Sequence, residues 1–102
     1  MSEASELNTR VADNPEQSRY EIFVDGELAG FTTYRLRPNN RIVALHSEVF
    51  PAFAHHGLAS ELARRMLDEI RARGLLISPR CPFVAQYIRD HDDYHDLVSD
   101  IA

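Results

Sequence analysis

The stretch FPAFAHHGLASELA, residues 50–63, decides how this chain folds. An extended run that ends at Glu48-Val49 is broken by Pro51, and a helical pattern restarts just after Gly57. The first turn of a helix carries backbone N–H groups without intrahelical partners, and the helix dipole adds partial positive charge there. The order of strand, short loop and helix N-terminus therefore favours a bound phosphate or pyrophosphate, and Gly57 lets such a group approach the backbone closely.

The loop does not match two common nucleotide-binding patterns. The chain has neither the GxGxxG of dinucleotide-binding folds nor the GxxxxGK[ST] of P-loops. Neither of those nucleotide classes is indicated.

A helix, a strand and a second helix are expected after the loop. Over residues 58–73 the main apolar side chains recur at helical spacing, at Leu58, Leu62, Met66 and Ile70. Gly74 ends this amphipathic helix, and residues 75–78 form a short apolar run typical of a buried parallel strand. Pro82 is well placed as the first residue of a second helix that runs to about residue 90.

Three antiparallel strands are expected before the loop. Apolar and polar residues alternate on both sides of Asp25-Gly26, and this dipeptide is a strong signal for a two-residue hairpin. A turn at residues 37–40 leads to a third strand at residues 41–49. The sequence thus predicts an α+β fold, in which a three-strand meander is followed by a helix, a parallel strand and a C-terminal helix, with the helices packed on a mixed sheet. Residues 1–17 are predicted to be a flexible arm and residues 18–102 a single domain.

Composition narrows the class of protein. A chain of 102 residues with a net charge of −5 forms one domain and does not suit a nucleic-acid surface. No apolar stretch is long enough to span a membrane, and MSEASELNTR, residues 1–10, lacks the apolar core of a secretory signal. The single cysteine cannot form an internal disulfide. A cytoplasmic location is expected.

The loop resembles a known binding element. EVFPAFAHHGLASELA, residues 48–63, looks like the acyl-CoA pyrophosphate loop of the GNAT superfamily of N-acyltransferases, whose pattern is [Q/R]-x-x-G-x-[G/A] after a strand ending in a V-x-P turn. Gly57 and Ala59 fill the last two fixed positions, but Ala54 stands at the first, where Gln or Arg is usual. SPRCPFVAQYI, residues 78–88, is similar to the small single-domain branch of that superfamily. Together the two resemblances cover residues 20–98.

The resemblance implies acetyl-CoA as cosubstrate and an amine as acceptor. The cofactor-binding residues that it implies are Val49, Phe50, His55, His56, Gly57, Leu58 and Ala59. Backbone N–H groups around Val49 and Phe50 are expected to stabilise the oxyanion of acyl transfer. One of the two histidines replaces the missing basic side chain, or both are simply exposed.

Three residues are candidates for catalysis. Cys81 is expected at the N-terminus of the second helix, where a thiolate is favoured and where it would face the acyl thioester; the alternative is a small buried core residue. His46 and Glu48 share one face of the third strand, and the resemblance suggests that one of them takes a proton from the acceptor amine. The alternative is a solvated strand face.

Two further patterns are weaker evidence of function. Many GNAT enzymes use a tyrosine in the second helix to protonate the leaving thiolate, but counting from Cys81 places Ile88, not Tyr87, at that position. His91 and His95 have the spacing of metal ligands on a helix, yet they lack a third ligand and lie among acidic residues, so no metal site is predicted.

Two functions fit these observations. The first is an N-acetyltransferase that acts on an unidentified amine. The second is a non-catalytic acyl-CoA-binding or interaction module, because few residues precede the first expected strand and the acceptor site would be open or supplied by a protein partner.

Overall fold

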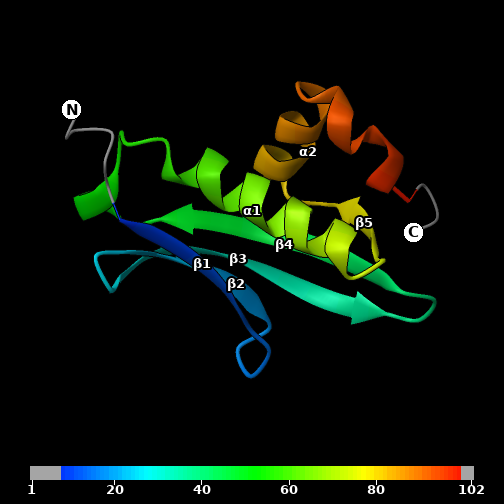
Figure 1. The fold of residues 1–102 in the computed structure, drawn as a ribbon, viewed down its shortest axis with the longest axis horizontal. Coiled ribbons are helices and arrows are strands. Elements are labelled where there is room, and N and C mark those ends of the chain that lie inside the picture. The colour runs from blue at the N-terminus through cyan, green and yellow to red at the C-terminus, as the bar shows by residue number, and fades with distance from the viewer. Residues whose placement is uncertain (1–7, 100–102) are drawn as a thin grey trace.

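A five-stranded sheet forms the centre of the computed structural model, which describes residues 8–99 (Figure 1). The strands lie side by side in chain order. They are β1 (Thr9–Asn14), β2 (Arg19–Val24), β3 (Glu27–Arg37), β4 (Arg41–Val49) and β5 (Leu76–Pro79). The first four pair antiparallel and β5 runs parallel to β4, so the predicted mixed sheet is confirmed.

Both α-helices lie on one side of this sheet, as Figure 1 shows. The helical elements are α1 (Leu58–Ala72), α2 (Pro82–Arg89) and the 3-10 segments η2 (Pro51–Phe53) and η3 (Asp92–Leu97). The buried face of α1 consists of Leu58, Leu62, Ala63, Met66, Leu67 and Ile70. Burying a Leu or Ile side chain contributes about 1.5–3 kcal/mol, so this face holds the helix on the sheet. No helix within residues 8–99 has the length and apolar content needed to cross a membrane.

The turns follow the predicted chemistry. Asp25 and Gly26 adopt φ values of 51° and 85°, which a two-residue hairpin with the twist of its strands requires. Asn39 and Asn40 adopt φ values of 66° and 58° between β3 and β4, and Asn tolerates this left-handed conformation better than most residues.

The N-terminal segment differs from the prediction. Residues 9–14 are not a flexible arm but the edge strand β1, which pairs antiparallel with β2 from Thr9↔Val24 to Asn14↔Arg19. The sequence prediction missed this strand because TRVADN has only one large apolar residue. The domain therefore begins before Ser18, and residues 1–7 lie outside the described part of the chain.

Polar contacts fasten β1 to the rest of the fold. The Tyr34 hydroxyl donates to Asp13 Oδ1 (2.6 Å), and Arg73 donates to Asp13 Oδ2 (3.3 Å) and to the Tyr20 hydroxyl (2.9 Å). Burial, followed by the hydrogen bond to Asp13, raises the pKa of Tyr34 well above its usual value. An edge strand that carries few apolar residues is thus held by hydrogen bonds that reach the end of α1.

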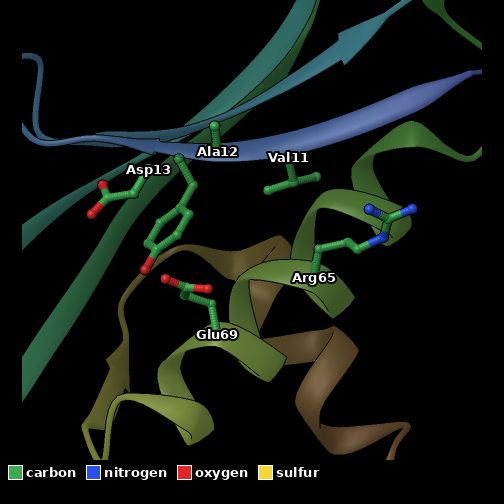
Figure 2. Close-up of a pocket in the computed structure, with 6 residues that line it drawn as sticks. Val11, Ala12, Asp13, Arg65 and Glu69 are labelled. Carbon is green, nitrogen blue, oxygen red and sulfur yellow. The ribbon is translucent and has the colours of Figure 1, made fainter.

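A hollow of about 280 Å³ lies along the seam between β1 and α1. Figure 2 shows Val11 pointing from β1 toward α1, with Arg65 and Glu69 extending from the helix. Arg65 already forms an ion pair with Glu61 (2.7 Å), and Asp13 is engaged as described above. Asp13 and Arg65, two charged residues of this hollow, therefore have partners within the fold.

One extra residue in β4 changes the direction of its side chains. Tyr34 pairs with Ala44 and Thr33 with His46, which leaves Leu45 unpaired as a β-bulge. Side chains alternate with a period of two, so one inserted residue exchanges the faces. Ile42 and Ala44 face the helices before the bulge; Ser47 and Val49 do so after it.

Candidate functional site

The strands β4 and β5 separate in the middle of the sheet. β5 pairs only with the first part of β4, from Arg41↔Leu76 to Ala44↔Pro79. The N–H groups of Arg80 and Cys81 both donate to the Ala44 carbonyl (2.9 Å each). Beyond Ala44 β4 has no strand neighbour on this side among the described residues. We call this opening the fork; its edge exposes strand backbone to a ligand.

A second hollow, of about 320 Å³, adjoins the fork at the N-terminus of α1. We call it the loop hollow. It is lined by Val49, Phe53, Ala54, His55, Gly57, Leu58, Ala59, Ser60 and Phe83. Five of the seven predicted cofactor-binding residues are among these; Phe50 and His56 are not. Phe83, which is 39% exposed, comes from α2 and was not predicted, because only the packing of α2 beside α1 brings it to the loop.

The backbone of the loop presents free donors. Gly57 is the N-cap of α1 with φ = 72°, a conformation that disfavours residues with a side chain. The first intrahelical bond runs from Glu61 N–H to the Gly57 carbonyl (3.1 Å). The N–H groups of Leu58, Ala59 and Ser60 therefore precede the helical hydrogen-bond ladder and point out of the helix end. Free N–H groups of this kind are able to donate to an anion at a helix N-terminus.

Phe50 does not have the predicted role in an oxyanion site. Its N–H donates to the Ala29 carbonyl of β3 (2.9 Å), so it is not available for a ligand. Successive residues of a strand direct their N–H groups to opposite sides, so the Val49 N–H points toward the fork. Of this predicted pair, only Val49 can act there. The Phe50 ring instead packs against Phe31 on the face of the sheet opposite the helices, with ring centroids 6.0 Å apart.

Cys81 lies on the helix-covered side of the fork. It is 2% exposed and is the N-cap of α2. Its thiol donates to Ser47 Oγ (3.3 Å), and the Ser47 hydroxyl shares a hydrogen bond with Thr32 Oγ1 (2.8 Å). The thiol thus begins a chain of three polar side chains that crosses β4. Burial agrees with the core alternative, while its place in the fork agrees with a residue that contacts an acyl group.

His46 and Glu48 lie together on the other face of the sheet. His46 Nε2 and Glu48 Oε1 are 3.4 Å apart, and both side chains are well exposed. The His46 ring also meets Phe31, with ring centroids 6.5 Å apart. The bulge at Leu45 places this pair opposite Cys81, so the structure brings two of the three predicted catalytic residues together and separates the third.

The second helix offers no hydroxyl to the fork. Ile88, at the position where the family often has tyrosine, is 4% exposed and belongs to the core. The Tyr87 ring stacks on His91 (centroids 3.9 Å apart), and His91 Nδ1 contacts the Tyr87 carbonyl (2.7 Å). Tyr87 therefore faces η3, and burial raises the pKa of its phenol.

The two C-terminal histidines have separate partners. His91 packs on Tyr87, whereas His95 Nε2 lies 3.6 Å from Asp92 Oδ1 at the surface. Within residues 8–99, no group of three or more His, Cys, Asp or Glu side chains could hold a metal ion.

Solved structures share this architecture. A GCN5-like protein from Staphylococcus aureus, solved by NMR, superimposes with a TM-score of 0.67 at 20% identity, covering 91% of this chain and 90% of that chain. Ard1 from Thermoplasma volcanium gives a TM-score of 0.55 at 24% identity, covering 81% of this chain and 57% of that one. A ribosomal-protein-alanine N-acetyltransferase from Brucella melitensis biovar Abortus 2308 gives 0.56 at 19% identity, covering 82% and 62%. At these identities the likeness concerns the fold.

The sequence itself matches a family model. No curated protein matches the chain in sequence. The model of the GCN5-related N-acetyl-transferase family, however, matches residues 19–97, which extend from the start of β2 through η3 and include the fork and the loop hollow. This chain belongs to the GCN5-related N-acetyltransferase family.

Proposed function

We propose that this protein binds acetyl-CoA in the fork and transfers the acetyl group to an amine. The observation that carries the proposal is the continuity between the fork and the loop hollow. The pyrophosphate lies on the N–H groups of Leu58, Ala59 and Ser60, and the pantetheine arm extends along the open edge of β4. Phe53 and Phe83 supply apolar contacts, and His55 is the histidine that lines the hollow.

The acetyl group then lies near Ser47 and Cys81, where the Val49 N–H is the donor for the developing oxyanion. The acceptor amine approaches from the face of the sheet opposite α1 and α2. An amine with the pKa of lysine is almost wholly protonated at pH 7 and must lose a proton before it attacks. His46 or Glu48 accepts that proton, directly or through one water. The amine attacks the thioester carbonyl, the C–S bond breaks, and CoA leaves as the thiolate or thiol.

The first test is binding. Titration calorimetry with acetyl-CoA should give a one-site isotherm, and the ligand should raise the melting temperature. A lack of both heat and thermal shift at millimolar acetyl-CoA would overturn the proposal.

The second test is turnover, followed by release of free CoA thiol with a panel of amines. The chain contains no lysine, so release does not arise from acetylation of its own lysine side chains. Replacing His46 or Glu48 by Gln should lower the rate about a hundredfold for the residue that is the base, with acetyl-CoA affinity unchanged. Glu27→Gln, at an exposed glutamate at the start of β3, is the matched control.

A binding module is the second candidate, and the position of Ile88 favours it. In the described residues of α2 no hydroxyl reaches the fork to protonate a leaving thiolate. Tight acetyl-CoA binding without thiol release for any amine would support this alternative over the enzyme.

A further inference from the structure

The face of the sheet opposite α1 and α2 carries a basic hollow beside the fork. It has a volume of about 120 Å³. Its lining residues are Arg35, Arg37, Val43, Leu45, Ser78 and Arg80. No acidic residue lines it, although the chain as a whole carries a net charge of −5. Three arginine side chains therefore line one hollow on a protein with a net negative charge. We call it the arginine hollow.

These three arginines differ from those on α1. Arg64 and Arg71 form ion pairs with Glu61 (2.8 Å) and Asp96 (3.0 Å). By contrast, the side chains of Arg35, Arg37 and Arg80 make no hydrogen bond or ion pair within residues 8–99. Like charges gathered without counter-charges repel, so an anion from outside the fold would stabilise the group.

The side-chain chemistry also points to an anion. Every basic residue in the chain other than histidine is arginine. A guanidinium presents donors in a planar fork that matches carboxylate and phosphate oxygens, whereas lysine acts as a point charge. Val43 and Leu45 supply an apolar wall between the arginines. The hollow is large enough for an anionic head group and a short aliphatic linker.

The position of the arginine hollow connects it to the proposed reaction. Val43 pairs with Ser78, one step before the last pair of β4 and β5, and Arg80 directly precedes Cys81. Leu45 is the bulged residue next to His46. A strand advances about 3.3 Å per residue, so the hollow lies within roughly 10 Å of the fork and of the candidate base on the same face.

We propose that the acceptor is an amine that also carries a carboxylate or phosphate group, and that Arg35, Arg37 and Arg80 hold this anionic group while the amine reaches the fork. The proposal rests on the proposed acetyl transfer and specifies its substrate class. The loop hollow holds the phosphates of CoA from the other end of the fork, so the two anionic ligands do not compete for the same donors.

Turnover with matched amines tests the substrate class. The carboxylate arm compares β-alanine with ethylamine, and the phosphate arm compares phosphoethanolamine with ethanolamine. At least one anionic amine should have kcat/KM about tenfold or more above its neutral counterpart, and added NaCl should reduce this preference. The arm with the larger ratio identifies the anionic group. Equal kcat/KM values in both arms would overturn the proposal.

Substitutions of the three arginines test whether their side chains hold the anionic group of the acceptor. Arg35→Gln, Arg37→Gln and Arg80→Gln should each raise KM for the preferred amine about tenfold and leave the KM for acetyl-CoA unchanged. Arg89→Gln is the matched control, because Arg89 is an exposed arginine of α2 whose side chain contacts Gln86 (2.8 Å). Variants that behave like Arg89→Gln would overturn the assignment.

A binding measurement tests the anion site independently of turnover. Inorganic phosphate and acetate, titrated at constant ionic strength, should shift the backbone amide NMR signals of Val43, Leu45 and Ser78, and Arg80→Gln should abolish the shifts. Such shifts support the anion site even if no amine is acetylated, in which case only the proposed transfer fails. Unshifted signals at millimolar anion, with acetyl-CoA still binding, overturn the arginine hollow and leave the proposed transfer intact.

Discussion

Gly30→Ala tests how the sheet positions the site. A Cβ atom on Gly30 would overlap the Glu48 carbonyl oxygen and lie 3.1 Å from Val49 Cα and 3.2 Å from Val49 Cγ2. Two of these neighbours are backbone atoms of β4, which cannot rotate away, so β3 and β4 must separate. Overpacking of this kind costs about 1–3 kcal/mol, and the rigid neighbours favour the upper half of that range.

The strands would separate where β4 enters the loop, so binding should suffer as well as stability. For a domain of this size about 2–3 kcal/mol corresponds to a fall of roughly 10–20 °C in melting temperature. Circular dichroism would measure the melting temperature, and calorimetry on the folded variant should show weaker acetyl-CoA binding because Val49 has moved.

Gly74→Asn is the matched control for Gly30→Ala. An added Cβ at Gly74 meets nothing within 4 Å, and its φ of +71° is one that Asn tolerates. This variant should lose less than about 1 kcal/mol and bind acetyl-CoA normally. A melting temperature for Gly30→Ala equal to that of the wild type would refute the steric reasoning.

Three further predictions concern the loop, the thiol and pH. Gly57→Val should weaken acetyl-CoA binding about tenfold in calorimetry because of its left-handed φ, whereas Ala54→Arg should retain or improve binding; the reverse order would contradict a backbone phosphate site. Cys81 is buried, so iodoacetamide should label it slowly both with and without CoA and quickly only after unfolding; fast labelling of the folded protein would contradict this burial. Burial and the hydrogen bond to Asp68 raise the pKa of Tyr94 from 10.0 to about 12. The stabilising contribution of Tyr94 is therefore complete below pH 10 and is lost as pH rises from 10 toward 12. Chemical denaturation should show that Tyr94→Phe loses less unfolding free energy over that pH range than the wild type, and an identical loss would refute this reasoning.

Much of the fold could be predicted from local sequence. Asp25-Gly26 fixed the first predicted hairpin, because few dipeptides adopt two positive φ values. The periodic apolar residues of α1 predicted both the helix and its buried face. The loop was predicted because Pro51 and Gly57 mark where a strand must end and a helix must begin. The family followed from the same residues.

The strand β1 shows where such patterns fail. TRVADN pairs with the neighbouring strand β2, but Tyr34 and Arg73, the side-chain partners of Asp13, are distant in sequence. A segment whose stability comes from partners elsewhere in the chain carries little periodicity of its own.

The sequence by itself determined the order of elements from β2 onward, the start of α1 after the loop and the pairing of His46 with Glu48 on one face. Only the tertiary structure decided which face that is. The unpaired residue Leu45 reverses which side chains of β4 face the helices, and neither composition nor residue spacing indicates this bulge. The same holds for the fork, for Phe83 at the loop hollow and for the arginine hollow. Each depends on how far two strands stay paired or on which elements pack together. Long-range contacts, rather than neighbouring residues in the sequence, decide both the extent of pairing and the packing.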